Sequence, residues 1–344
     1  MVIVLDVAID GGFLVMKKKI NLSLNMKIAL GIASGFLLTL ILIPVFFVLA
    51  TAAEIDEDDI SAETVSNELE EVENFYITVL RTERDEFETI EFERYIIGVV
   101  AAEMPALFEL DALRAQAIAA RTYAMRILEH EAYILDTVMH QVFLDDDQLT
   151  DRWGNDFDIH FATIEEAVRS TKGLVLVYND ELITPMFFAM SSGATENSED
   201  VFTGARPYLR SVASTGYENR SDFSASERFT VAELREAFAD ESITRDNISI
   251  LAHSEGGNVS EIKIGSQSYT GRQVREILGL RSAAFSLRSF RRGVTFTTYG
   301  HGHGVGMSQH GANAMAREGY TYEEILQHFY QDVMIVEKNF LDRE

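Results

Sequence analysis

The sequence predicts an α+β protein in which a single N-terminal transmembrane helix is followed by an extracytoplasmic region of mixed helices and strands. Three observations predict this class. One uncharged apolar run of membrane-spanning length lies near the N-terminus, the remaining chain mixes strand-like alternation with helical periodicity, and no internal repeat is present. The sequence leaves open whether the exported region divides into two subdomains around a groove.

Residues 28–53 form an uncharged apolar run, and this run is longer than the roughly 20 residues needed to span a bilayer. Lysines precede this run and acidic residues follow it from Glu54 onward, so the positive-inside rule predicts a short cytoplasmic segment over 1–27 and export of everything after the anchor. The alternative is a cleaved secretory signal, because Ala50-Thr51-Ala52 fits a cleavage site. We favour the uncleaved anchor because the apolar run is longer than a usual signal core.

The N-terminal segment 1–27 contains further methionines at Met16 and Met26, so its true start is uncertain. Residues 54–74 are acidic and polar and are interpreted as a linker that holds the following domain away from the membrane. Residues 75–344 are expected to form the folded domain.

Local patterns predict the first elements of this domain. Apolar residues alternate from Phe75 to Val79 and recur to Phe92, as in a hairpin, and a helix over 95–102 is expected to stop before Pro105. An alanine-rich helix is expected from an N-cap at Asp111 to about residue 129. Further strands are expected at 173–178, 182–190, 248–251, 259–264 and 294–299. Further helices are expected at 231–239 and 271–278. A last helix is expected to begin at the capping box of Thr321 and Glu324, after Gly319 has ended the helix before it.

The amino-acid composition limits the partners and the kinds of catalysis that are possible for this chain. The chain has 29 Lys plus Arg against 55 Asp plus Glu, a net charge of −26, which argues against a nucleic-acid partner. It has no Cys, which excludes disulfides, a thiolate nucleophile and a Cys-ligated zinc site. Catalysis would therefore depend on carboxylates, His, hydroxyls or a hard metal, and we expect no cofactor.

Glu103 is the first candidate for catalysis. It lies in the segment GVVAAEMP, at the end of an apolar helix and before a turn at Pro105. An apolar setting raises the pKa of a carboxyl because desolvation disfavours the charged form, as a general acid requires. The spacing alone does not separate this role from that of a solvated Glu at a helix end.

Several blocks of the sequence resemble the stage II sporulation protein D family, whose domain is shared with amidase-enhancer proteins. The resemblance spans most of the exported part. Its blocks are GVVAAEMPALFELDALRAQAIAARTYAMR at 98–126, MSSGATENSEDVF at 190–202, YLRSVAS at 208–214 and GHGHGVGMSQHGANAMAREGYTYEEIL at 300–326. The membrane anchor is similar to that of the sporulation member.

This resemblance implies a peptidoglycan lytic transglycosylase that acts on glycan strands stripped of stem peptides. Glu103 matches the catalytic Glu of the family. In that chemistry one carboxylic acid protonates the glycosidic oxygen and the carbon-6 hydroxyl of the muramic sugar closes onto the anomeric carbon. No second carboxylate is needed, unlike in most glycoside hydrolases.

Candidate substrate-binding residues lie in three further segments. Arg121 and Tyr123 follow on the next helix, where bracing the helix ends is an equally good interpretation. The loop after residue 190 offers small hydroxyl residues beside glycine, which let a sugar approach, although such residues also make turns. These loop candidates are Ser191, Ser192, Gly193, Thr195 and Glu196.

In the glycine-rich block, His303 and Gln309 are expected to touch sugar, with the backbone placed against the Glu103 helix. His301 and His303 would share one face of an extended segment, but no carboxylate nearby supports a metal site. His140 and Gln141 either face the groove or hold a loop. Some relatives place Cys near a His there to bind zinc, which this chain cannot do.

The resemblance further implies a place in septal wall degradation during engulfment, in the mother-cell membrane facing the forespore. Its implied partners are peptidoglycan glycan strands, a peptide-stripping amidase (stage II sporulation protein P) and a membrane scaffold (stage II sporulation protein M). The alternative function is a non-catalytic wall-binding enhancer of an N-acetylmuramoyl-L-alanine amidase. A hydrolytic version of the enzyme, in which water replaces the internal hydroxyl, would differ only in its products.

Overall fold

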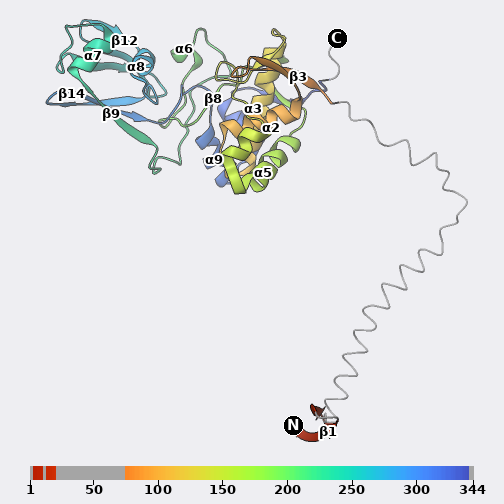
Figure 1. Ribbon diagram of the computed structural model, residues 1–344. Helices are drawn as coiled ribbons and strands as arrows, with labels where there is room; N and C mark the ends of the chain where they lie inside the picture. The colour runs from red at the N-terminus through yellow and green to blue at the C-terminus, as the bar shows by residue number, and fades with distance from the viewer. Residues whose placement is uncertain (1–2, 11–12, 21–73, 341–344) are drawn as a thin grey trace, which may run out of the picture. The chain divides into compact units, whose positions relative to one another are not determined.

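The computed structural model describes residues 3–10, 13–20 and 74–340 (Figure 1). Within these ranges no helix combines the length and the apolar character that crossing a bilayer requires. The predicted span 28–53 and the linker up to residue 73 lie outside the described residues. In the first 20 residues, where the sequence predicted no element, β1 (Ile3–Asp10) pairs antiparallel with β2 (Phe13–Ile20).

The rest of the described chain is mixed α and β, as predicted, and contains two hydrophobic cores. We call residues 74–223 with 300–340 the main lobe and residues 224–299 the small lobe. The main lobe begins with a sheet of order β4-β3-β5, formed by β3 (Tyr76–Arg81), β4 (Glu86–Glu91) and β5 (Ile134–Leu135).

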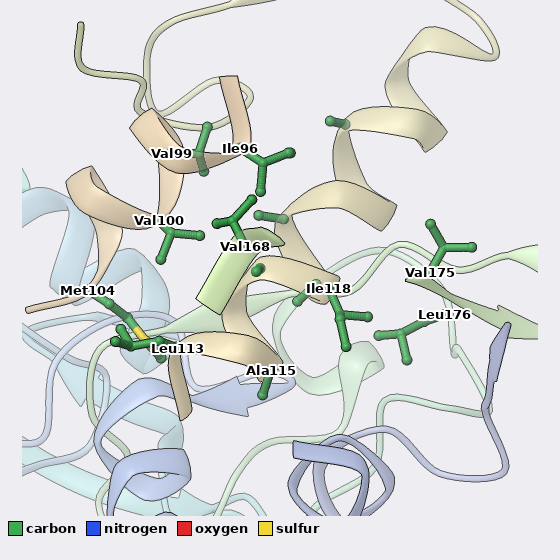
Figure 2. Close-up of a cluster of buried hydrophobic side chains, with 14 of the residues drawn as sticks. Ile96, Val99, Val100, Met104, Leu113, Ala115, Ile118, Val168, Val175 and Leu176 are labelled. Carbon is green, nitrogen blue, oxygen red and sulfur yellow. The ribbon is translucent and has the colours of Figure 1, made fainter. Parts of the chain in front are cut away.

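Three helices form the centre of the main lobe: α2 (Phe92–Glu103), α3 (Leu110–Leu128) and α5 (Phe157–Arg169). Figure 2 shows Val100 of α2, Ile118 of α3 and Val168 of α5 in one cluster, and all three are fully buried. Because the buried face of α3 is largely alanine, neighbouring helices approach it closely. This packing fixes where α2 ends.

The C-terminal part of the chain completes the main lobe. α9 (Gln309–Arg317) and α10 (Tyr322–Phe329) contact α3. A second sheet has the order β16-β6-β7, and β8 pairs parallel with β15. These strands are β6 (Leu174–Tyr178), β7 (Glu181–Leu182), β8 (Phe187–Phe188), β15 (Met307–Ser308) and β16 (Met334–Glu337). Three short helices lie between the larger elements: α4 (Asp146–Trp153), η1 (Gly154–Asp156) and α6 (Ser198–Val201).

The small lobe is an insertion with its own core. The core includes Leu234, Ile262, Val274 and Phe296, all fully buried. The Gly300 N–H donates to the Phe223 carbonyl at 2.8 Å, so the chain leaves and re-enters the main lobe at neighbouring points. Two three-stranded sheets and two helices make up this lobe: β9 (Ser224–Thr230), β10 (Ile248–His253), β11 (Val259–Ile264), β12 (Gln267–Tyr269), β13 (Phe285–Phe290), β14 (Gly293–Tyr299), α7 (Val231–Phe238) and α8 (Gly271–Leu278).

Two predicted boundaries were wrong. Helix α3 is capped at Glu109, and Asp111 lies in its first turn, where the carboxylate accepts from the Tyr322 N–H at 3.3 Å. The strand expected over 182–190 breaks after Leu182, because Pro185 cannot donate to a ladder. The capping box of Thr321 and Glu324 is confirmed at the start of α10.

Gly98 allows the segment that follows β5 to lie against α2. A Cβ at this position would lie 2.4 Å from the Phe143 ring and 2.5 Å from the Leu144 carbonyl oxygen. We expect Gly98→Ala to lower stability by about 1–3 kcal/mol, because the backbone at residues 143–144 would have to move. Thermal unfolding of the parent and the variant measures this effect. An unchanged melting temperature for Gly98→Ala would contradict the close packing.

Candidate active site

Glu103 is the last residue of α2, where the helix is stopped by the extended conformation of Met104 before Pro105. The Arg152 side chain, from α4, donates to the carbonyl oxygens of Ala101 at 3.3 Å and Ala102 at 3.2 Å. A cation at this place satisfies carbonyls that a helix end leaves free and complements the helix dipole. Arg152 is therefore held beside the Glu103 carboxyl.

The surroundings of Glu103 favour its protonated form. Burial raises the pKa of the carboxyl above its ordinary value, and this effect outweighs three others that lower it. Those are hydrogen bonding from the Gln309 side chain, hydrogen bonding from the Val142 backbone N–H, and the charge of Arg152. The group can thus carry a proton at a pH where an exposed Glu has lost it.

Buried polar groups without partners accompany Glu103. The Tyr95 hydroxyl, both amide atoms of Gln141 and the amide nitrogen of Gln309 are buried and make no hydrogen bond of normal geometry. Gln309 nevertheless acts on the Glu103 carboxyl, Gln141 precedes Val142, and the charge of Glu103 contributes to the raised pKa of Tyr95. Buried polar groups are nearly always paired, so unpaired ones beside a protonatable carboxyl indicate a place for a polar ligand.

Tyr123 belongs to the same region. It is half-buried, burial raises the pKa of its phenol, and the charge of Arg206 opposes that shift. Tyr95 and Tyr123 are close enough to influence each other, because Tyr123 contributes to the raised pKa of Tyr95. Tyr123 thus remains a candidate for substrate contact.

Arg121 is not available to substrate, which corrects the prediction. Its side chain is fully buried and pairs with Glu93 through two hydrogen bonds, of 2.9 Å and 2.6 Å. It also donates to the carbonyls of Val168 and Leu174, each at 3.2 Å. Arg121 therefore holds α3 against α2, α5 and β6. This is the alternative role, bracing the helices, that the sequence also allowed.

Most of the loop after β8 is also structural. The Ser191 hydroxyl is buried against Tyr217 Oη and the Ser214 carbonyl, and the Thr195 hydroxyl bonds the backbone of Arg210 and Val212. These contacts contradict the prediction that Ser191 and Thr195 bind sugar. Ser192 and Gly193 instead line an open cavity against the small lobe.

Glu196 connects the two lobes. One carboxylate oxygen accepts from the Ser254 hydroxyl and from the Asn258 N–H, both at 2.9 Å, while the other oxygen is buried without a partner. Burial raises the pKa of this carboxyl. The backbone at Gly256 and Gly304 packs closely against the Glu196 side chain, since a Cβ on either glycine would lie within 3 Å of that side chain. Glu196 is thus enclosed, not exposed to a strand of glycan.

The glycine-rich segment is not extended, so the expected shared face of His301 and His303 is wrong. Its four alternating glycines all have positive φ, between 70° and 116°, which turns the chain at every second residue. The segment packs on residues 186–196, while Gln309, which follows it, hydrogen-bonds to the Glu103 carboxyl at the end of α2. Both ring nitrogens of His303 are occupied, because Nδ1 accepts from the Val305 N–H at 3.1 Å and Nε2 donates to the Phe187 carbonyl at 3.0 Å. The predicted His303 contact with sugar through these nitrogens is therefore wrong.

His140 holds a loop. Its Nδ1 accepts from the Leu135 N–H at 3.0 Å, and its Nε2 lies 3.8 Å from Glu131. Over the described ranges, no group of three or more His, Asp and Glu side chains is placed to hold a metal ion. Of the pair proposed from the sequence, only Gln141 lies with unpaired atoms beside the Glu103 region.

Sequence reasoning missed two residues of this site, Arg152 and Tyr95. The segment Asp145 to Gln148 has capping-box spacing, so α4 and a basic residue in its last turn could have been predicted. Nothing local shows that this turn lies on the end of α2, 50 residues earlier. In the sequence, Tyr95 resembles an ordinary core residue. Its ring stacks on that of Phe143, with the two ring centres 5.3 Å apart.

Comparison with known proteins supports the resemblance. A family model described as stage II sporulation protein matches residues 81–178, which include Glu103. Stage II sporulation protein D of Bacillus subtilis (strain 168) is 39% identical over 280 residues, covering 78% of this chain and 81% of that protein. The chain belongs to the stage II sporulation protein D family.

Other relatives agree with this assignment. Stage II sporulation protein D of Bacillus amyloliquefaciens is 39% identical over 270 residues, covering 76% of this chain and 78% of that protein. The amidase enhancer of Bacillus subtilis (strain 168) is 28% identical over 288 residues, which is 68% of this chain but 39% of that protein. The family domain is therefore shared with a protein named for stimulating an amidase, as the sequence blocks implied.

Proposed function

We propose that this member of the sporulation family is a lytic transglycosylase that cleaves peptidoglycan glycan strands lacking stem peptides, with Glu103 as the general acid. The observation that carries the proposal is the carboxyl of Glu103, whose pKa burial raises, together with the buried groups of Tyr95 and Gln141, which lack hydrogen-bond partners. A sugar strand supplies the hydroxyl and amide partners that such groups lack.

One carboxyl suffices for the proposed reaction. The protonated Glu103 gives its proton to the glycosidic oxygen as the bond from that oxygen to the anomeric carbon breaks. The carbon-6 hydroxyl of the same muramic residue forms the new bond to the anomeric carbon and releases its proton to the Glu103 carboxylate. The acid is regenerated, no water is consumed, and the products are one ordinary chain end and one 1,6-anhydro end.

Product analysis tests this reaction. The purified full chain is incubated with glycan strands freed of stem peptides, and the fragments are identified by mass spectrometry. Fragments ending in anhydro-muramic acid support the proposal. Fragments carrying an added water would instead make the protein a hydrolase, and an absence of fragments would remove the enzymatic function.

Arg152 is expected to set the pH range of the reaction. Its charge lowers the pKa of Glu103, so Arg152→Gln, which removes that charge, should raise the pKa. A general acid works only while protonated, so the decline in rate on the alkaline side should move to higher pH. The pH profile of kcat/KM measures this shift. The control is Arg169→Gln, an exposed arginine of α5, and an unchanged profile for Arg152→Gln would contradict the assigned role.

The similarity to an amidase enhancer favours one second candidate, a module that binds wall glycan and stimulates an amidase. In that case the full chain would raise the rate of a peptide-stripping amidase on intact peptidoglycan, and Glu103→Gln would do so equally well. Loss of stimulation in that variant would link the stimulation to cleavage.

We further propose that the domain works outside the cytoplasm, held at the membrane by residues 28–53 and facing the septal wall. The peptide-stripping amidase and the membrane scaffold of the sporulation pathway would be its partners. Protease accessibility of residues 74–340 on intact cells tests the orientation, and recovery of these proteins by crosslinking tests the partners.

A further inference from the structure

A pocket lies between the two lobes. Its main-lobe wall contains Phe202 and His303, and its small-lobe wall contains Arg272 and Arg275 of α8. Hydroxyl and amide side chains complete the lining, namely Ser254, Asn258, Ser260 and Thr270. Two acidic residues, Asp200 and Glu276, also border it.

Arg275 has no acidic partner in this pocket. Its guanidinium is partly buried, Nε donates to the Leu280 carbonyl at 3.2 Å, and it forms no ion pair with any carboxylate of the described residues. Burial lowers the pKa of Arg275, and the charge of Arg272 adds to that effect, while Glu276 opposes it. Arginine nevertheless stays protonated at neutral pH.

The other charged groups do not neutralise Arg275. The nearest acid, Glu276, is engaged by Arg272 at 2.8 Å, and Asp200 is exposed. Burial, together with the charges of Arg275 and Arg272, lowers the pKa of His303 to about 4, although the hydrogen bond to the Phe187 carbonyl opposes this shift. In a chain whose net charge is −26, a partly buried guanidinium without an acidic partner can bind an anionic ligand.

The rest of the lining suits a sugar. Phe202 contributes an aromatic ring, with the Arg272 guanidinium carbon 5.7 Å from its ring centre, and Asn258 and Ser260 contribute polar side chains for ring substituents. The hydroxyls of Ser254 and Thr270 are engaged by Glu196 and by the N-cap of α8. A guanidinium pairs with a carboxylate through two parallel hydrogen bonds. The combination points to a carboxylated sugar.

We propose that this pocket is a glycan subsite in which Arg275 binds the free lactyl carboxylate of a muramic residue. The proposal rests on the proposed function and explains its substrate preference. That carboxylate is free only after the stem peptide has been removed, because the peptide is attached through an amide at the same carbon. A strand that still carries peptides would leave Arg275 unpaired and would have to place the peptide in the pocket.

A binding experiment tests the subsite without relying on cleavage. The full chain carrying Glu103→Gln is titrated with peptide-free strands and with the same strands whose lactyl carboxylates have been converted to carboxamides. The carboxamide strands are expected to bind about tenfold or more weakly, because a charge-assisted pair is lost. The added variant Arg275→Gln should bind both strands alike, and the added variant Arg291→Gln, an exposed arginine of the same lobe, should keep the preference.

Equal binding of the two strands by the Glu103→Gln chain would overturn the proposal, and so would a preference that survives Arg275→Gln. A glycerol phosphate polymer that competes better than the carboxylate strands would assign the pocket to phosphate and also overturn it. Because the carboxamide change leaves the protein unaltered, the carboxylate preference is measured independently of folding, and matching melting curves of the Arg275→Gln and Arg291→Gln chains allow the preference to be assigned to Arg275. If the proposed function fails, no strand is cleaved although the carboxylate preference remains. If only the subsite fails, both strands are cleaved equally.

Discussion

Replacing Glu103 with Gln is expected to lower the rate of glycan cleavage by roughly 10²–10⁴-fold while the fold is kept. The amide has nearly the shape of the carboxyl but cannot deliver a proton to the glycosidic oxygen. The rate is followed as anhydro ends released from peptide-free strands. The matched control is Glu109→Gln, an exposed carboxyl six residues further on, which should cleave at the parent rate.

The same substitution should not destabilise the protein at neutral pH. Burial raises the pKa of Glu103 in the folded chain, so its stabilising contribution is present below the unfolded pKa and is lost as pH rises through the folded pKa. Gln does not ionise, so the variant should melt at the same or a higher temperature than the parent at pH 7, with the difference vanishing in acid. A folded variant that still cleaves at the parent rate would exclude Glu103 as the acid.

Replacing Arg121 with Met is expected to cost about 3–5 kcal/mol of stability, because it leaves the Glu93 carboxylate buried without its partner. For a domain of this size that is a fall of roughly 10 °C or more in Tm. Thermal unfolding measures it. Arg126, which is half-buried and pairs with Glu129, supplies the control, since Arg126→Met should cost at most about 1 kcal/mol.

A double variant separates the ion pair from general core damage. Glu93→Gln combined with Arg121→Met should recover part of the lost stability, because no unpaired charge remains. If Arg121→Met melted like the parent and lost only glycan binding, the residue would be a substrate contact after all.

The predictions that succeeded depend on residues close in sequence. The bounds of α8 and the start of α10 follow from caps formed within four residues, and β11 follows from its own alternation. The end of the apolar helix before Pro105 is likewise a local feature, whereas the catalytic role of Glu103 came from the family resemblance and stays a prediction. Its raised pKa follows from the same burial that the apolar segment predicts.

The predictions that failed depend on contacts between distant segments. Arg121 is buried by Glu93, 28 residues away, and His303 is held by the Phe187 carbonyl, 116 residues away. Neither contact can be predicted from the spacing of residues in the sequence. A polar side chain on an alanine-rich helix or in a glycine-rich turn can face either solvent or another part of the protein. The position of Arg152 on the end of α2 was invisible for the same reason.

The late position of α9 has a consequence for how the protein matures. Gln309 and the strand β16, which pairs with β6, are made after the small lobe, whose core needs only residues 224–299. As the chain emerges from the ribosome, the small lobe can therefore fold first, while the Glu103 helix still lacks α9 and α10. The carboxyl acquires its full surroundings only when the final segments arrive. If the proposed function holds, a nascent or C-terminally shortened chain should therefore cleave no glycan, and the order of synthesis would delay activity until the molecule is whole.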